Sequence, residues 1–452
     1  MDYFLLYVLV SFDEPNYIFN LFANSSRFYT HAHAHLYTSS LYFQGTGFIK
    51  ALVNVFGAKQ YHPILQASAI SSYYTNFYVT INVGSFIASM SAPILAHKSI
   101  VGTYFIPFGS MVLGLGIFLL FSKRYVRGPP EKKALCSTLS LLGKRAVLCK
   151  KFDDSKKSNN GPLNDTFVDG VKRLLMVFPV TLLVLPFQLV YNQMNTAFIS
   201  QGLAMRAAGS SETVIIDASF MNVFDTISCI LMGLFLGQVF YPALAKRNIY
   251  FPITYKYAAG AAFATLAVLS SVFIDMGIKS VYNKTDEQIS VFWMAIPYFL
   301  VGMGEVLTNS ASYEAAFRIA PKEQKGLASA IQLFMMGSFP GFINNGIVSV
   351  VSGWFPVKDE SNSPIENTGL YVNSRVGDYF WILVTLVFIF GVGMNLLPPV
   401  KNFVERVVDN AIDATKIEFS QMGEDDGDSD DDDNYNEDSE SGTSNDDDDE
   451  DQ

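Results

Sequence analysis

The stretch VFWMAIPYFLVGMGEVLTNSASY, residues 291–313, is long and apolar enough to cross a lipid bilayer, and its one charged residue is Glu305. An ionised carboxylate near the middle of a membrane helix costs roughly 2.5–3.5 kcal/mol on insertion scales, so such residues usually face a polar interior and carry function. The alternative is a carboxyl group that is neutral, or paired for packing alone. Glu305 therefore predicts a membrane helix with a functional acidic group.

The composition agrees with a membrane protein that carries a soluble extension. Half of the residues are hydrophobic and only 16% are charged, against roughly 25% in an average soluble domain. The net charge of −11 is concentrated at one end, because residues 424–451 contain 17 acidic residues and no basic one. Without this segment the charge is +6, the sign expected of a membrane protein with basic cytoplasmic loops.

About nine stretches approach the ~20 residues that a bilayer requires. They predict an all-α membrane protein with spans at 36–56, 73–95, 101–121, 174–200, 219–240, 255–275, 291–313, 327–354 and 379–399.

The longest polar segment of the body, residues 122–173, is rich in Lys and Arg and is expected in the cytoplasm. Counting spans from it places the glycosylation sequon at Asn283 outside and the C-terminus inside. The expected organisation is a lead-in at 1–35, three helices of an N-terminal bundle at 36–121, the basic cytoplasmic linker at 122–173, a six-helix C-terminal bundle at 174–400, and a cytoplasmic, acidic, disordered tail at 401–452. Secondary transporters of the commonest superfamily have two six-helix halves, so the chain is expected to be N-terminally incomplete by three helices.

Several motifs resemble those of the proton-dependent oligopeptide transporter family, particularly its fungal-type peptide transporters. They occur in consistent order between residues 45 and 399: GTGFIK at 45–50, NVFGAKQY at 54–61, FYVTINVGS at 77–85, YNQMNTAFISQG at 191–202, FMNVFDTI at 220–227 and FWMAIPYFLVGMGEVLTNSASYEAAFRIAP at 292–321. The resemblance implies a major facilitator-type bundle and proton-coupled symport of di- and tripeptides. Its ExxER-type motif, expected on a first helix, has no match here, so either the gene model starts late or the protein is a truncated member.

Four residues form the candidate substrate and proton site. A short peptide is a zwitterion with variable side chains, so a site that accepts many peptides must hold the two termini. Lys50 suits the carboxylate end, and Glu305, with Asn82 and Asp225, suits the ammonium end; the resemblance assigns matching positions these roles, usually with asparagine in place of Asp225. Proton coupling needs a carboxylate whose affinity for a proton changes when the site fills. The alternatives are a structural, snorkelling Lys50 and an Asp225 that is hydrated near the outer surface.

Further residues are weaker candidates. Tyr78, Tyr191 and Trp293 are expected either to line side-chain pockets or to pack at membrane interfaces. Asn192 and Gln193 match positions where the family places an acidic residue and a glutamine beside the cavity. Glu314 lies nine residues after Glu305, on the opposite face and about 13 Å closer to the cytoplasm, and is expected in an inner gate or in a salt bridge with a neighbouring basic loop.

Other classes of function have little support. The sequence has no nucleotide-binding or nucleophile motif, so neither an enzyme, a cofactor nor a nucleic-acid partner is expected. The three cysteines have no metal-ligand spacing, and the HAHAH run at 31–35 has no further ligand beside it, so no metal site is expected.

The expected partners are small peptides, protons and the bilayer, with the plasma membrane favoured over vacuolar or lysosomal membranes. The acidic tail could solvate the protein, bind a basic partner or be phosphorylated at Ser429, Thr443 or Ser444. Two other functions stay open: a carrier of other small solutes, and a non-transporting membrane protein that presents the tail.

Overall fold

The computed structural model describes residues 47, 49–62, 64–98, 100–126, 134–148, 151–208, 216, 218–249, 251–356 and 364–425. Within these ranges the chain is helical, with three isolated β-bridges and no strand. The predicted all-α fold is confirmed. The predicted lead-in at 1–35, with its HAHAH run, lies outside the described residues.

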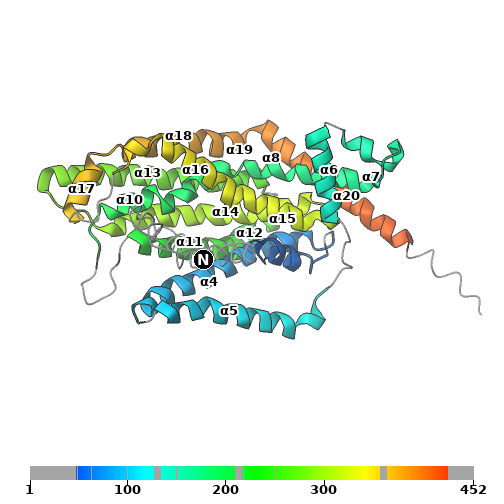
Figure 1. The fold of residues 1–452 in the computed structure, drawn as a ribbon, viewed down its shortest axis with the longest axis horizontal. Coiled ribbons are helices and arrows are strands. Elements are labelled where there is room, and N and C mark those ends of the chain that lie inside the picture. The colour runs from blue at the N-terminus through cyan, green and yellow to red at the C-terminus, as the bar shows by residue number, and fades with distance from the viewer. Residues whose placement is uncertain are drawn as a thin grey trace, which may run out of the picture.

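The N-terminal part contains the helix Ile49–Ala58, α4 (Ala67–Lys98), α5 (Ile100–Leu120) and η1 (Ser122–Arg124). α5 packs along α4 and otherwise stands apart from the bundle (Figure 1). Its apolar side chains are exposed around the helix, including those of Phe108, Leu113 and Leu119. Such a surface suits a lipid environment.

The C-terminal bundle follows the linker. Its elements are α8 (Val177–Leu182), α9 (Leu185–Tyr191), η4 (Asn192–Asn195), α10 (Ala197–Leu203), η5 (Ala218–Met221), α11 (Asn222–Phe235), η6 (Leu236–Phe240), α12 (Tyr241–Lys246), α13 (Ile253–Thr285), η7 (Val291–Met294), α14 (Ala295–Ile319), η8 (Lys322–Gln324), α15 (Lys325–Leu333), η9 (Phe334–Ser338), α16 (Phe339–Val350), η10 (Ser352–Trp354), α17 (Pro364–Val372), α18 (Val376–Leu386), η11 (Val387–Gly393) and α19 (Met394–Leu396).

Five continuous helices in the described part are long and apolar enough to cross a membrane, and a bent pair makes a sixth. The bend of 52° separates Asp165–Leu182 from Leu185–Leu203. Pro186 lies at the start of α9, where it cannot continue the hydrogen bonding of the preceding turn. The predicted fourth span is therefore broken, and the total of nine spans stays a prediction.

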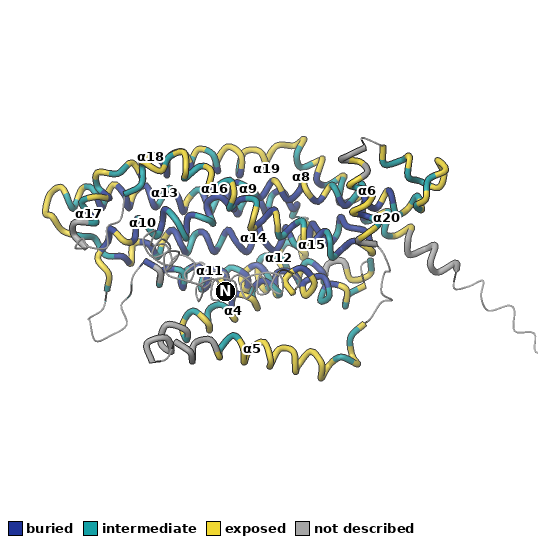
Figure 2. Tube along the Cα trace, in the orientation of Figure 1, coloured by how far each residue is buried: buried dark blue, intermediate teal, exposed yellow. Residues whose placement is uncertain are grey.

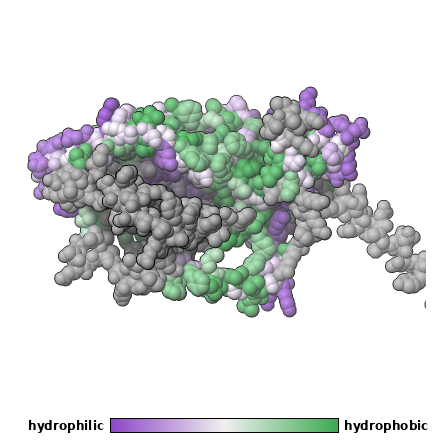
Figure 3. Space-filling view, in the orientation of Figure 1, coloured by the Kyte–Doolittle hydropathy of each residue, from purple (hydrophilic) through white to green (hydrophobic). Residues whose placement is uncertain are grey.

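The core of the bundle lies around α13 and α14, which are the most deeply buried elements in Figure 2. On the face shown in Figure 3, apolar residues gather over the middle of the molecule and hydrophilic residues lie toward its two ends. One end carries the linker and the C-terminal helix, and the other carries α10 and α17 (Figure 1). They are called the linker end and the far end below.

The linker is a folded unit, where the sequence predicted a basic connecting segment. It contains α6 (Ala134–Leu148), η2 (Phe152–Ser155), η3 (Lys157–Asn159) and α7 (Asp165–Leu175). Leu141, Val168 and Val171 form a small core between α6 and α7. Gln324 Nε2 in η8 donates to Thr138 Oγ1 over 3.3 Å, which ties this unit to the turn between α14 and α15.

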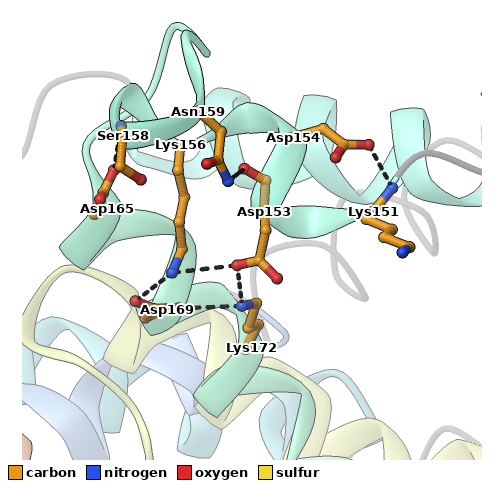
Figure 4. Close-up of polar contacts among 9 residues, drawn as sticks. All are labelled: Lys151, Asp153, Asp154, Lys156, Ser158, Asn159, Asp165, Asp169 and Lys172. Carbon is orange, nitrogen blue, oxygen red and sulfur yellow. Dashed lines mark hydrogen bonds and ion pairs between the residues drawn. The ribbon is translucent and has the colours of Figure 1, made fainter.

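Charges within the linker neutralise one another (Figure 4). Lys156 Nζ lies 3.2 Å from Asp153 Oδ1 and 2.9 Å from Asp169 Oδ2. Lys172 Nζ lies 2.6 Å from Asp153 Oδ1 and 3.2 Å from Asp169 Oδ1. The two lysines and two aspartates thus form a closed network that holds η2 against α7.

The expectation of disorder from residue 401 onward is wrong for the first part of the tail. A helix, α20 (Pro398–Asp425), continues from the bundle at the linker end. Val404, Val408 and Ala411 are buried, and their spacing of four and three residues places them on one helix face, which packs against α13 and α14. Because of the acidic run, the start of the disordered tail was predicted too early in the sequence. Residues 426–452 lie outside the described ranges.

Candidate functional site

Two glycines bring α14 close to its neighbours just before Glu305. A Cβ atom on Gly302 would collide with the backbone carbonyl oxygen of Asp225 on α11, and one on Gly304 would lie 2.6 Å from the carbonyl oxygen of Gly260 on α13. Small residues permit such close helix packing in membranes. Glu305, the next residue, is consequently only 4% exposed.

One carboxylate oxygen of Glu305 is held by α4 and by its own helix. Tyr78 of α4 donates its hydroxyl to Glu305 Oε1, and Asn309 Nδ2 lies 3.4 Å from the same oxygen. Asn309 Nδ2 also donates to the Tyr78 hydroxyl over 2.7 Å, while Gln188 Nε2 donates to Asn309 Oδ1 over 2.8 Å. This chain of hydrogen bonds fixes the orientation of Glu305.

The other oxygen faces α11. Cys229 Sγ lies 3.4 Å from Glu305 Oε2, and one ligand atom from each of Asp225, Cys229 and Glu305 lies within 4.8 Å of the other two. Asp225 is 8% exposed, and its carboxyl group lies within hydrogen-bond reach of the Glu305 carboxyl group. The alternative of an Asp225 hydrated at the outer surface does not hold. Two acidic side chains and a thiol share this buried space.

Asn82 lies on the same helix as Tyr78, whereas Lys50 lies on the helix Ile49–Ala58. Asn82 is buried one turn beyond Tyr78 on α4 and donates its Nδ2 to the Tyr78 carbonyl oxygen over 3.0 Å. Lys50 has an exposed side chain. It lies one turn before Asn54, whose Nδ2 donates to Ser329 Oγ over 3.0 Å. Residues four apart share a helix face, so Lys50 points to the side of its helix that faces the C-terminal bundle.

The structure separates the remaining candidates. Tyr191 is partly buried and lies within reach of the Glu305 carboxyl group. Asn192 donates to the carbonyl oxygen of Gln188 in the preceding helix, α9, over 2.9 Å. Gln193 belongs to a different buried network with Asn344 and Tyr379. Trp293 is 56% exposed and lies on the surface rather than with the Glu305 group.

Glu314 forms salt bridges, but its partners lie on helices and not on the basic loop that was predicted. Its Oε2 lies 3.0 Å from Lys256 Nζ of α13, and its Oε1 lies 2.9 Å from Arg318 Nη2. Ser71 Oγ of α4 also donates to Oε2 over 2.9 Å. Glu314 therefore connects the N-terminal helices to the C-terminal bundle toward the linker end.

Aromatic packing surrounds this contact. Tyr74 of α4 stacks on Tyr313 of α14 with ring centroids 6.1 Å apart, and its ring lies 5.9 Å from that of Phe317. Val55, Ala58 and Ile70 complete the buried cluster. The two parts of the molecule are thus pressed together between the Glu305 group and the linker end.

Sequence reasoning missed several members of these groups. Cys229 follows Asp225 by four residues and Asn309 follows Glu305 by four, so each pair shares a helix face. That spacing could have identified both residues. Ser71 and Lys256 carry no such signal, because their link to Glu314 depends on the packing of three helices.

Comparison with known proteins agrees with the motifs. A family model described as PTR2, POT family, matches residues 17–362. The "Probable peptide transporter ptr2" of Schizosaccharomyces pombe is 27% identical over 279 residues, which cover 58% of this chain and 44% of that protein. "Protein NRT1/ PTR FAMILY 8.1" of Arabidopsis thaliana is 26% identical over 413 residues, 76% of this chain and 70% of that protein. This chain therefore aligns with less than half of the fission yeast protein.

A solved structure has a similar fold. A solved structure of an auto-inhibited POT family peptide transporter has a TM-score of 0.51 at 23% identity, and the match covers 77% of this chain and 74% of that one. This likeness confirms the transporter-type helical bundle. With the family match over most of its length, the chain belongs to the POT family, whose members are multi-pass membrane transporters.

Proposed function

We propose that this protein carries out proton-coupled symport of di- and tripeptides. The observation that carries the proposal is the buried Glu305 carboxylate, which Tyr78 contacts from α4 while Cys229 and Asp225 approach from α11. The family match supports it, as do the relatives named as peptide transporters.

Two carboxylates in one buried space suit a symporter. Both cannot stay ionised so close together without a positive charge to offset them. A proton on one carboxyl group and the peptide ammonium on the other would satisfy both. Binding of the proton then favours binding of the peptide, and binding of the peptide favours binding of the proton, as symport requires.

The positions of the acidic groups support this assignment. The family resemblance expects an acidic residue at position 192 and asparagine at 225, whereas this chain has Asn192 and Asp225. The second carboxylate is therefore on α11, beside Glu305, instead of in the segment after α9. Lys50, with an exposed side chain turned toward the C-terminal bundle, would hold the peptide carboxylate.

An inner gate is the role proposed for the Glu314 group. The hydrogen bond from Ser71 to Glu314 and the reciprocal pair between Asn54 and Ser329 both cross between the two parts of the molecule. Opening toward the linker end must break these contacts and separate Tyr74 from Tyr313. Lys256 and Arg318 stay with Glu314 on the C-terminal side, so its charge remains paired when the gate opens.

The topology supports a cytoplasmic linker end. Basic residues gather in the linker, and short basic segments favour the cytoplasmic side. The C-terminus is then cytoplasmic, and the plasma membrane is the proposed location.

Uptake of a labelled dipeptide by cells that express the protein tests this function. Glu305→Gln removes the charge that holds the ammonium, and a hydrogen bond to a charged group is worth about 1.5–3 kcal/mol, so uptake should fall roughly 10- to 100-fold. The matched control is Glu323→Gln, at an exposed position in η8. Unlabelled dipeptide should compete, whereas nitrate and histidine should not. Unchanged uptake in Glu305→Gln would remove the site assignment, and competition by nitrate or histidine would indicate another substrate.

A further inference from the structure

Exposed basic side chains gather where α5 ends. Lys59 follows the helix Ile49–Ala58, and Lys123 and Arg124 lie in η1, directly after α5; all three side chains are exposed. α5 itself runs from the far end to the linker end and is largely exposed (Figure 1, Figure 2). We propose that Lys59, Lys123 and Arg124, with the apolar surface of α5 beside them, bind an anionic phospholipid through its headgroup.

A pair of hydrogen bonds joins the two basic segments. Val126 N donates to Gln60 Oε1 over 2.8 Å, and Gln60 Nε2 donates to the Val126 carbonyl oxygen over 3.3 Å. Gln60 directly follows Lys59, and Val126 lies two residues after Arg124. The contact therefore holds the two charged segments next to each other, so that their positive charges act on one ligand.

Aromatic rings support the same contact. The rings of Phe56, Phe118 and Tyr125 form one cluster, with centroids 5.2 or 5.5 Å apart. The Arg124 guanidinium lies 5.5 Å from the ring centroid of Phe121, which is 39% exposed. Aromatic side chains are enriched where a membrane meets water. Basic side chains at that depth extend toward the lipid headgroups.

The charge of this surface has no counterpart in its own part of the molecule. Residues 15–130 contain no aspartate or glutamate. Within the described ranges, neither Lys59, Lys123 nor Arg124 forms a salt bridge, whereas the lysines of the linker network are paired with aspartates. A group of positive charges that is not neutralised attracts anions, and both ammonium and guanidinium groups bind phosphate.

A lipid fits this surface better than other anions do. Leu119 is 59% exposed and Leu120 is 76% exposed, so acyl chains can lie along α5 while the headgroup meets the charges. The acidic run at 424–451 also follows the linker end, but it contains no aliphatic side chain to cover that apolar surface. With the linker end in the cytoplasm, as proposed above, the charges face the leaflet that carries anionic lipids.

Native mass spectrometry of the purified full-length protein in detergent tests the proposal. Phosphatidylserine and phosphatidylcholine with the same acyl chains are titrated separately. The first phosphatidylserine should bind roughly tenfold more tightly than the first phosphatidylcholine, and the difference should shrink as the ionic strength rises. Equal affinity for the two lipids would overturn the proposal, and it is also the result expected if the acidic tail occupies the surface.

Matched variants separate this surface from the overall charge. Combining Lys59→Gln, Lys123→Gln and Arg124→Gln should abolish the preference for phosphatidylserine. The control removes the same charge at exposed positions elsewhere, with Lys157→Gln, Lys284→Gln and Lys416→Gln, and should keep the preference.

A charge-preserving variant, Lys59→Arg with Lys123→Arg, should also keep the preference. An unchanged preference in the first triple variant, or an equal loss in the control, would overturn the proposal. The inference does not depend on which solute the protein transports. No step of the experiment involves transport, so failure here is distinct from failure of the proposed symport.

Discussion

The two carboxylate oxygens of Glu305 have different surroundings, and this asymmetry links the site to the movement of the bundles. Oε1 accepts a hydrogen bond from the hydroxyl of Tyr78, which belongs to α4 in the N-terminal part. Oε2 faces Cys229 in the C-terminal bundle. If α4 moves away from α14, Glu305 loses a hydrogen bond from only one side. The chemistry of this residue therefore reports the relative position of the two parts.

Tyr78→Phe should show this dependence. The variant keeps the ring but removes the hydroxyl that contacts Glu305 and Asn309. A hydrogen bond to a charged group is worth about 1.5 kcal/mol, so its loss predicts a roughly tenfold fall in dipeptide uptake. Tyr282→Phe, on the last turns of α13 toward the far end, is the control and should behave like the unmodified protein. Equal uptake in the two variants would show that the Tyr78 hydroxyl is not needed.

At the residue scale, the sequence was most informative where a charge interrupts an apolar run. Glu305 stands out because a membrane span tolerates few charges, and Asp225 stands out for the same reason. Cys229 and Asn309 each lie one turn after one of these acidic residues, so their spacing could have identified them. The approach of α4, α11 and α14 that brings them together could not be read from the sequence.

Among the elements, α14 joins the candidate site to the proposed gate. Glu305 and Glu314 lie on the same helix, nine residues apart, so a shift of α14 affects both. The buried pair of Glu314 with Lys256 is the electrostatic part of this connection. Removing one member leaves the other charge buried without an adequate partner.

Glu314→Gln should therefore destabilise the protein, by about 3–5 kcal/mol for a broken buried pair. The double variant Lys256→Met with Glu314→Gln should regain part of the loss, because it removes both buried charges together. Thermal unfolding in detergent ranks the variants by stability, with Glu323→Gln as the exposed control. A double variant less stable than Glu314→Gln would contradict a pairing of these two residues.

The linker network should not respond to mild acidification. Hydrogen bonds from Lys172 and Lys156 lower the pKa of Asp153 below its ordinary value of 3.8. A carboxylate with a lowered pKa stabilises the folded state above its unfolded-state pKa, and that contribution is lost only as pH falls through the folded-state value. The network therefore stays intact at neutral and mildly acidic pH.

Asp153→Asn should loosen this unit, because one side of the network loses its charge. Hydrogen exchange of the amides in η2, η3 and α7 should become faster than in the unmodified protein, while α13 and α14 keep their protection. Asp378→Asn, which affects an exposed pair with Arg375 at the far end, is the matched control. Unchanged exchange in the linker would mean that its apolar core alone holds it.

Element boundaries were predicted well only where hydropathy decides them. The apolar runs located α11, α13, α14 and α18 because each crosses a buried or lipid-facing region. α7 and α20 are amphipathic, and their apolar residues are too few to show as spans. Their helical state depends on packing against the bundle, which explains why the linker and the first part of the tail were misjudged.

For the whole molecule, the order of motifs predicted the family and the bundle, whereas contacts between distant segments could not be read from it. Ser71 meets Glu314 across 243 residues, and Asn54 meets Ser329 across 275. These contacts need the N-terminal helices to dock on α14 and α15. The docking places Lys50 on the side of its helix that faces the C-terminal bundle.

Gradient-driven uptake by the purified chain in proteoliposomes tests the central claim most directly. An inward proton gradient should accumulate a labelled dipeptide above equilibrium, a protonophore should abolish that accumulation, and Glu305→Gln should not accumulate the dipeptide at all. Equal uptake with and without the gradient, or equal accumulation by Glu305→Gln, would contradict a proton-coupled peptide symporter centred on Glu305.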